Sequence, residues 1–510
     1  MAVEYLADAA EQAAPDGLSF CHWPLWRLSE ALQAGEICAL DLVHHCEAAF
    51  RRDHAAVNAL ALHDYDAARQ AARRADDERR AGRASGALHG IPFSIKESFD
   101  VAGWPTTCGD PRHVGNIAAR DAAATARLRQ AGGILVGKSN VPCHLRDWQS
   151  YNALHGTTRN PHDLSRTPGG SSGGSAAAVC TGMSVFDVGS DIGSSLRNPA
   201  HYCGIFSHKS THGLVSLAGH GIASDDPAPD INVAGPLARS ARDLEIILRV
   251  LADDATQLAA PRPAHLADCR VAVLPTHPFA PVDGGVASVI EALGRDLERV
   301  GASVAWNAVP DIDAAELWRT YVLMLRAATS IYADDAAYEA LRARAGAVDP
   351  RDDSYAALQY RGAALDHRAW LQLAQARRRF ARAWDAFFAR HDVLLCPAAA
   401  TAAFPLDEAG EPWQRTLTVN GQPQPMTTQL FWAGYSGLCG LPSTVAPAGR
   451  DPAGLPVGVQ IVASRSHDLT SLRVAQWLEA RGYAYRPPRR ALLEPPRGRP
   501  PRTIFHAARN

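Results

Sequence analysis

The sequence predicts an α/β fold, in which helices cover both faces of a central β-sheet. The chain has 510 residues, of which 47% are hydrophobic, enough for one large core or for two to three ordinary domains. From residue 88 onward, short apolar segments alternate with helical patterns. Between residues 311 and 390 the strand patterns stop and long helical patterns take over. We therefore expect a single domain, residues 1–510, with a helical insertion.

An N-terminal helical layer is expected at about residues 20–85. Leucines recur at helical spacing over residues 25–32, and Gly35 follows as a stop signal. Two more helices are expected over residues 40–51 and 64–83, the second of which is rich in charged side chains. Because such a charge run is typical of a solvated face, we expect these helices to wrap the outside of the core.

The alternating core is expected at about residues 86–310 and 391–485. Its strands are predicted where short apolar runs are bounded by glycine or polar residues: 91–95, 134–136, 184–188, 271–274, 303–306, 393–396 and 457–462. Helices are predicted between them: 122–131, 175–181, 240–251, 286–300 and 469–478. The alternation places helices on both faces of the sheet.

Two further segments complete the predicted organisation. Residues 311–390 are expected to form the helical insertion over the sheet, with long helices at 317–345 and 367–390. The last segment, 486–510, is rich in proline and arginine and is expected to be a surface arm.

Charge and apolar patterning argue against several functions. The net charge is −2 and the isoelectric point is near 6.9, so no basic field for nucleic acid or for an acidic membrane is present. No apolar stretch is long enough to span a bilayer, and no signal peptide is expected at the N-terminus.

Cysteine usage predicts a cytoplasmic protein without a metal site. The ten cysteines lie at irregular spacings with no Cys-x-x-Cys pair, which indicates reduced thiols. The trio His44, His45 and Cys46 is adjacent in sequence rather than at ligand spacing, so a helix surface is the favoured interpretation.

Lysine is rare in this chain. Among 51 Lys and Arg residues, only Lys96, Lys138 and Lys209 are lysine. Because arginine does not lose its proton near neutral pH, positions that retain lysine are candidates for acid–base chemistry. Structural roles are favoured for Lys138 and Lys209. Lys96 ends an apolar strand, where burial lowers the pKa of an amine.

The stretch from Thr167 to Pro199 is dense in glycine and serine. Glycine is costly where its backbone freedom is not needed, so the stretch is expected to aim amides and hydroxyls at a ligand. Ser171 and Ser195 lie in two of its tight turns. Together with a neutral amine at Lys96, they form the parts of a Ser–Lys acyl-transfer site, in which a serine attacks a carbonyl after losing its proton.

These motifs resemble the amidase signature family. The resemblance rests on the segments 90–96, 168–178 and 189–199, with further matches at 156–161 and 454–461, and it covers about residues 25–485. It implies a mixed central sheet with a helical insertion. It also implies hydrolysis of a carboxylic acid amide to an acid and an amine or ammonia, without any cofactor.

Carried over position by position, the resemblance implies a Ser–cis-Ser–Lys triad. Ser195 is the nucleophile, Ser171 relays its proton, and Lys96 is the base, which must be neutral at the moment of attack. The peptide bond between Gly170 and Ser171 is expected to be cis. The implied oxyanion-hole amides are those of Ile192, Gly193, Ser194 and Ser195, and the residues implied to brace the turn are Asp191 and Arg197.

Position 194 departs from the family. The family's turn before the nucleophile is Gly-Gly-Ser, whereas this chain has Gly193-Ser194-Ser195. A serine at position 194 is strained if the position needs a positive φ, and otherwise it only adds a hydroxyl near the oxyanion hole. Attack by Ser194 stays open, although the spacing favours Ser195.

Simpler interpretations compete with this site. The Gly-Ser turn could be a phosphate loop, but it lacks the Gly-Lys-Ser/Thr ending. Lys96 could instead form a structural ion pair with Glu97 or Asp100. Substrate contacts are predicted for an apolar or aryl pocket, although core packing is an equal alternative for the aromatic candidates. The candidates are Trp148, Ser150, Gly170, Trp432 and Tyr435.

Two other functions stay open. One is acyl or amide transfer, as by the amidase subunit of a tRNA-dependent amidotransferase, which makes ammonia from glutamine for a partner chain. The other is a catalytically silent scaffold, against which the intact Lys96, Ser171 and Ser195 argue. The expected substrate is a small-molecule amide. Its identity and the oligomeric state do not follow from the sequence, so a homodimer stays open.

Overall fold

The computed structural model describes residues 20–84, 86–222 and 229–489. Its central sheet has eleven strands in the order β1-β3-β2-β6-β8-β7-β14-β15-β11-β9-β10. The sheet is mixed, because β2 runs parallel to β3 and β6, whereas β7 pairs antiparallel with β8 and β14. This confirms the predicted α/β fold. The expected surface arm lies outside the described residues from position 490 onward.

Every strand predicted from the sequence is present, within a few residues of its expected ends. The strands of the sheet are β1 (Leu60–His63), β2 (Pro92–Lys96), β3 (Ile134–Ser139), β6 (Phe186–Asp191), β7 (Phe206–Lys209), β8 (Val233–Ala238), β9 (Arg270–Val273), β10 (Ser303–Trp306), β11 (Val393–Pro397), β14 (Ser443–Arg450) and β15 (Pro456–Val462). Two short pairs lie outside it: β4 (Tyr151–Asn152) with β5 (Gly156–Thr157), and β12 (Thr416–Val419) with β13 (Gln422–Pro425). Among the strands that the prediction missed are β7, whose polar sequence is fully buried, and β8, whose glycine and proline argue against a strand.

The helices surround this sheet. They are α2 (Leu25–Ala34), α3 (Ala39–Val57), α4 (Tyr65–Arg80), α5 (Ala123–Gln130), α6 (Gly173–Thr181), α7 (Arg197–Cys203), α8 (Ala241–Leu251), α9 (Gly284–Arg299), α10 (Ala314–Ser330), α11 (Asp335–Ala347), α12 (Tyr355–Ala363), α13 (His367–Phe388), α14 (Leu430–Gly437) and α15 (Asp468–Ala480). None of these described helices has the length and apolar character needed to cross a membrane.

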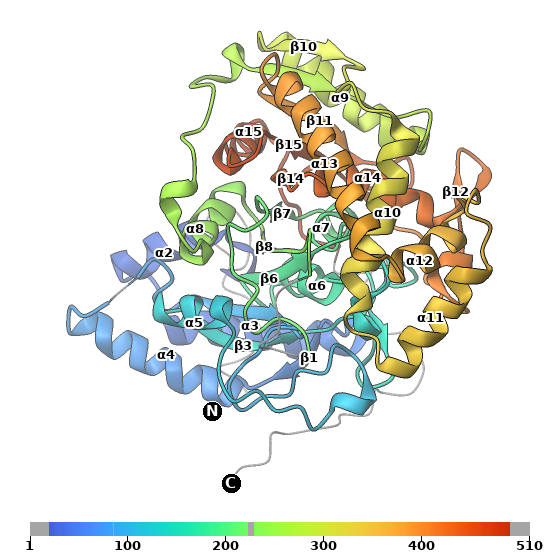
Figure 1. Cartoon of the computed structure of the whole chain (residues 1–510). Helices are drawn as coiled ribbons and strands as arrows, with labels where there is room; N and C mark the ends of the chain where they lie inside the picture. The colour runs from blue at the N-terminus through green and yellow to red at the C-terminus, as the bar shows by residue number, and fades with distance from the viewer. Residues whose placement is uncertain (1–19, 85, 223–228, 490–510) are drawn as a thin grey trace.

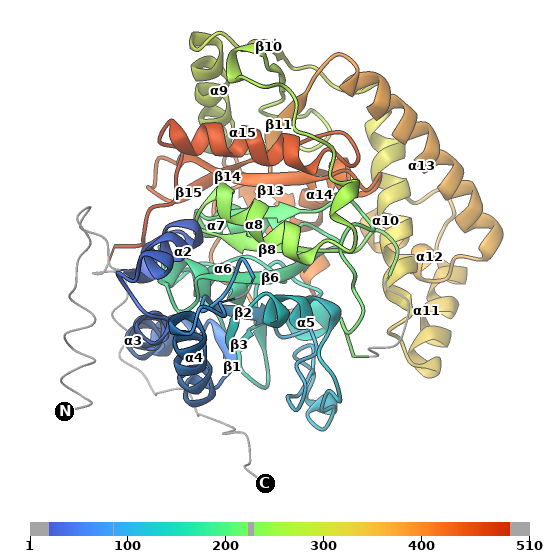
Figure 2. The ribbon, with the colours of Figure 1, turned by 90° about the vertical axis from the view of Figure 1, so that its left-hand side faces the viewer.

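The N-terminal helices form at the predicted places. Helix α2 ends at Gly35, whose φ of 72° is the left-handed conformation of a helix terminus. Asp64 caps α4 by accepting the amide hydrogen of Ala67. Helices α2, α3 and α4 lie together at one side of the molecule, outside the sheet (Figure 2).

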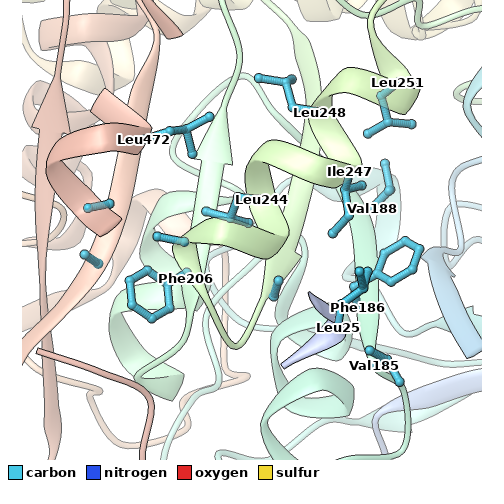
Figure 3. Close-up of a cluster of buried hydrophobic side chains, with 14 of the residues drawn as sticks. Leu25, Val185, Phe186, Val188, Phe206, Leu244, Ile247, Leu248, Leu251 and Leu472 are labelled. Carbon is cyan, nitrogen blue, oxygen red and sulfur yellow. The ribbon is translucent and has the colours of Figure 1, made fainter. Parts of the chain in front are cut away.

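Alternating residues of the central strands face two helical layers. On β14, Val445 packs in one cluster with Val179 of α6, while the next residue, Ala446, packs in another cluster with Leu244 of α8 and Leu472 of α15. Figure 3 shows the second layer, including Leu244 and Leu472. Full burial of each such leucine contributes roughly 1.5–3 kcal/mol, so the two layers fix the strand register that positions the site.

The segment predicted to be the helical insertion contains α10 to α13, which lie together on one flank of the molecule (Figure 1). The prediction of one helix over 317–345 is wrong. The structure has two helices there, because α10 ends at Ser330 and α11 begins at Asp335. Asp334 caps α11 by accepting the amide hydrogen of Ala337, so a new helix begins there. Helix α12 was not predicted. Helix α10 carries residues that reach the candidate site.

Candidate active site

The site lies where two neighbouring parallel strands end. Lys96 is the last residue of β2, and Ser190 and Asp191 end the adjacent strand β6. The Nζ atom of Lys96 donates to Ser171 Oγ at 2.7 Å and to Ser190 Oγ at 3.0 Å. Lys96 is fully buried, and this burial lowers its pKa from 10.5 to about 7. A large fraction of this amine is therefore neutral at physiological pH.

The competing ion-pair interpretation of Lys96 does not fit the geometry. The carboxylate of the adjacent Glu97 accepts the backbone amides of Thr107 at 2.6 Å and Cys108 at 2.8 Å. Among the described residues, no salt bridge to Lys96 is formed. Lys138 is held instead by the Pro105 carbonyl at 2.6 Å and Thr106 Oγ1 at 3.0 Å.

The glycine-rich loop places Ser171 just before α6. The peptide bond between Gly170 and Ser171 is cis, as the family resemblance implies. A Cβ atom at Gly170 would lie 2.3 Å from the Asp147 carbonyl oxygen, and one at Gly174 would lie 2.3 Å from the Asn140 nitrogen. Only glycine fits at these two positions, because the loop is pressed against neighbouring backbone.

The second turn, residues 192–195, is braced by a buried ion pair. Asp191 accepts the amides of Ser194 at 2.9 Å and Leu196 at 3.0 Å, and it pairs with Arg197 at 2.8 Å. Burial alone would raise the pKa of Asp191, but the Arg197 guanidinium holds it at about 2. Asn198 ties the two loops together, because its Nδ2 donates to the carbonyls of Gly170 and Ser194.

Position 194 adopts the strained alternative of the two that the sequence left open. Ser194 has a φ of 77°, in the left-handed region that favours glycine. Its hydroxyl lies 3.5 Å from the Ala398 carbonyl, to which it donates a weak hydrogen bond. Ser194 is absent from the pocket wall among the described residues, whereas Ser195 is part of it.

Hydrogen bonds also fix the carbonyl groups of this turn. Trp148 Nε1 donates to the Gly193 carbonyl, and the Tyr321 hydroxyl of α10 donates to the Ile192 carbonyl, both at 2.8 Å. Because a trans peptide group is planar, each bond also fixes the direction of the next amide N–H. The Ser194 amide is already bound to Asp191. Within the described residues, no hydrogen bond engages the amides of Ile192, Gly193 and Ser195.

These groups open into one pocket of about 390 Å³. Its wall includes Ser171, Ser190, Ile192, Gly193 and Ser195 from the two loops, together with Trp148. Helices α10, α11 and α12 supply the opposite part of the wall, including Leu325, Arg326, Leu341, Tyr355 and Tyr360. The pocket therefore joins the serines, with Lys96 bound behind two of them, to a mixed apolar, aromatic and cationic surface.

Several residues predicted to bind substrate lie elsewhere. Trp432 is fully buried and Tyr435 nearly so, both in the hydrophobic cluster under α14. The buried hydroxyl of Ser150 donates to the Gly169 carbonyl at 3.0 Å, and Gly170 is enclosed by backbone. None of these four residues belongs to the described pocket wall. Trp148 is the predicted substrate-binding residue that lines the pocket.

The sequence reasoning missed other residues of the pocket. Ser190 bonds to Lys96, and the His220 ring lies 2.9 Å from the Ser190 hydroxyl. The position of Ser190 in the motif could have identified it, since Ser190 lies one residue before Asp191 in the second glycine-rich segment. No comparable signal marks Tyr321 or Arg326, because a helical pattern does not show which neighbour a helix packs against.

One group near the pocket mouth has the chemistry of metal ligands. Oxygen, sulfur and nitrogen atoms of Asp110, Cys143 and His144 lie within 4.8 Å of one another. However, Arg112 already binds the Asp110 carboxylate with two nitrogens, at 2.7 and 2.9 Å. The carboxylate is therefore occupied by a cation that a metal ion would have to displace.

Comparisons with known proteins show what this chain is similar to. The chain is 30% identical over 478 residues to an indoleacetamide hydrolase of Bradyrhizobium diazoefficiens, covering 90% of this chain and 87% of the relative. It is 31% identical over 488 residues to a glutamyl-tRNA(Gln) amidotransferase subunit of Deinococcus radiodurans, covering 89% and 96%. A crystal structure described as an amidase superposes with a TM-score of 0.74 at 27% identity, covering 90% of this chain and 100% of that one. Fold and relatives together define an enzyme that hydrolyses amides.

The family follows from a direct match. Residues 41–472 match the model of the family described as Amidase, which is most of the chain. The chain belongs to this family, and the predicted resemblance to the amidase signature enzymes is confirmed.

Proposed function

We propose that this enzyme hydrolyses a small carboxylic acid amide through an acyl-enzyme on Ser195, with Ser171 and Lys96 as its proton relay. The observation that carries the proposal is the 2.7 Å contact between Lys96 and Ser171 at the base of the pocket that Ser195 also lines. A buried amine with a pKa of about 7 has the basicity that a general base needs near neutral pH. No cofactor is required for these steps.

In the proposed reaction, Ser195 Oγ attacks the amide carbonyl carbon while its proton passes to Ser171, whose own proton passes to Lys96. The tetrahedral intermediate then collapses, the C–N bond breaks, and the proton returns through Ser171 to the leaving amine. A water molecule attacks the resulting ester by the same relay. This second attack releases the acid and restores the Ser195 hydroxyl.

The negative oxygen of the intermediate needs hydrogen-bond donors. We assign this role to the amides of Ile192, Gly193 and Ser195, because the Ser194 amide is bound to Asp191. The family resemblance implied four oxyanion-hole amides, and this assignment leaves out that of Ser194. Tyr321 holds the Ile192 carbonyl, so the free Gly193 amide is oriented before the reaction begins. Trp148 holds the Gly193 carbonyl and with it the Ser194 amide, which is bound to Asp191.

Amide transfer remains the second candidate, because relatives of nearly equal identity include amidotransferase subunits. Purified chain, without any partner, should release ammonia from indole-3-acetamide, benzamide or a short aliphatic amide, and it should do so faster than from glutamine. The hydrolase proposal would be contradicted if the chain released ammonia from glutamine but from none of these amides, and only after a partner protein is added.

We also propose a cytoplasmic location, which the cysteine pattern of the sequence predicts. In support, the cysteines whose side chains the structure describes are all free thiols.

A further inference from the structure

Arg326 is an arginine of the pocket wall that forms no ion pair with any residue the structure describes. Arg326 of α10 lines the pocket, and its Nε atom is buried without a hydrogen-bond partner. No ion pair or side-chain hydrogen bond of Arg326 occurs among the described residues, and its Cζ atom lies 5.3 Å from the centre of the Tyr355 ring. Because burying an unpaired charge is costly, such a group calls for a ligand.

A second arginine lies on the same wall. Arg146 lines the pocket, and its Nη2 donates to the carbonyl of Thr329, one helical turn beyond Arg326 on α10. Burial and, after it, the charge of Arg146 lower the pKa of Arg326 to about 10. The two guanidinium groups therefore act on one region of the pocket.

The acidic residues of the described wall do not neutralise this pair. Asp147 is bound to Arg415 at 2.6 Å in a buried ion pair. Glu411 is exposed at the N-cap of the short helix Pro412–Gln414, and its charge acts on Arg146. Arg326 thus faces the pocket with a positive charge that no acidic side chain of the described residues pairs with.

Both arginines belong to elements that hold the proposed oxyanion turn. Tyr321, which binds the Ile192 carbonyl, precedes Arg326 by five residues on α10, a rise of roughly 7.5 Å along the helix axis. Trp148, which binds the Gly193 carbonyl, follows Arg146 by two residues. A group bound between the arginines would therefore lie several atoms away from a carbonyl bound at the turn.

We propose that Arg326 and Arg146 form a carboxylate-binding subsite, so that the preferred substrate is an amide carrying a carboxylate several atoms from the scissile bond. The planar guanidinium groups suit this ligand, because each can donate two parallel hydrogen bonds to a carboxylate. The inference rests on the proposed amide hydrolysis and names the substrate class within it.

The test uses matched substrates that differ only in charge. Monoamides of succinic, glutaric, adipic and pimelic acid are compared with the methyl esters of the same monoamides. N-acetyl-4-aminobenzoate is compared with its methyl ester, to place the carboxylate on the amine side. For one chain length of the diacid series, or for the carboxylate on the amine side, the wild-type kcat/KM should favour the anionic substrate at least about tenfold. A hydrogen bond to a charged group is worth that much. Arg326→Met should abolish this preference, because it should lower kcat/KM for the anionic substrates at least about tenfold more than for their neutral partners.

The chain offers a matched control on the same helix. Arg319 of α10 is exposed and pairs with Asp353 at 3.4 Å, so Arg319→Met should keep the preference. Equal use of neutral and anionic substrates by the wild type, or equal losses for both in Arg326→Met, would overturn the subsite.

A binding measurement separates this proposal from the proposed chemistry. In Ser195→Ala, adipate and pimelate should raise the melting temperature, and Arg326→Met in that background should remove the shift. If no amide is hydrolysed but this shift is present, the proposed function fails and the subsite stands. If amides are hydrolysed and no dicarboxylate binds or is preferred, the subsite alone fails.

Discussion

The pH dependence of the enzyme follows from the burial of Lys96. In the proposed relay, only the neutral amine can accept a proton from Ser171, and burial lowers the pKa of this amine from 10.5 to about 7. At pH 7, about half of the amine is then neutral, against roughly one part in three thousand for an exposed lysine. The buried site therefore supplies on the order of a thousand times more of the base form than a surface lysine would.

We expect kcat/KM to be level above about pH 8 and to fall about tenfold for each pH unit below about pH 6, with a midpoint near pH 7. The assay follows hydrolysis of 4-nitroacetanilide, or the best amide of the panel, by absorbance from pH 5 to pH 9 at constant ionic strength. Because kcat/KM reports the free enzyme, the midpoint is that of the unliganded site.

A second buried lysine provides the matched control. Burial lowers the pKa of Lys209 to about 7 as well, but its Nζ atom donates to the Ser210 carbonyl at 3.5 Å, whereas that of Lys96 donates to Ser171. Lys209→Met should leave the midpoint within about 0.3 pH units, whereas Lys96→Arg should reduce kcat/KM by at least about a thousandfold, because arginine keeps its proton. A profile that is flat from pH 5 to pH 9, or a midpoint that moves with Lys209→Met, would refute the reasoning.

Two further predictions concern the turn at residues 192–195. Tyr321→Phe should lower kcat by about tenfold with little change in KM, because it leaves the Ile192 carbonyl without its 2.8 Å partner and loosens the Gly193 amide. Steady-state kinetics measure both constants. A change in KM alone would contradict a positioning role for Tyr321. Ser194→Gly should raise the free energy of unfolding by about 1 kcal/mol, because glycine relieves the φ of 77°. Thermal denaturation should show a rise of roughly 1 °C for a chain of this size, and a lower melting temperature would show that the bond to Ala398 dominates.

The fold was predictable to the extent that its elements carry local patterns. Strands such as 134–136 and 457–462 are short apolar runs, and α2 has both its leucine spacing and its glycine stop in the sequence. Strand β7 escaped prediction because Ser207, His208 and Lys209 are buried only through long-range contacts, such as that of His208 with Asp468. Tertiary pairing there overrides the local polarity.

The two loops and the lysine of the candidate site were predictable because they carry recognisable motifs. The part of the pocket wall that α10, α11 and α12 supply was not predictable, because its chemistry depends on how these helices pack in the folded chain. Nothing local distinguishes Arg326, which faces the pocket, from Arg319 on the same helix, which faces solvent. The opposite error arose at Trp432 and Tyr435, whose aromatic side chains suggested a pocket but pack into the core.

The most direct test of the central claim is to identify the nucleophilic serine. The purified enzyme is treated with a fluorophosphonate, and the intact protein and its peptides are weighed by mass spectrometry. The account predicts one adduct per chain, on Ser195, that is lost in Ser195→Ala, strongly slowed in Lys96→Ala and retained in Ser194→Gly. An adduct on Ser194, or labelling that persists at the wild-type rate in Ser195→Ala, would contradict it.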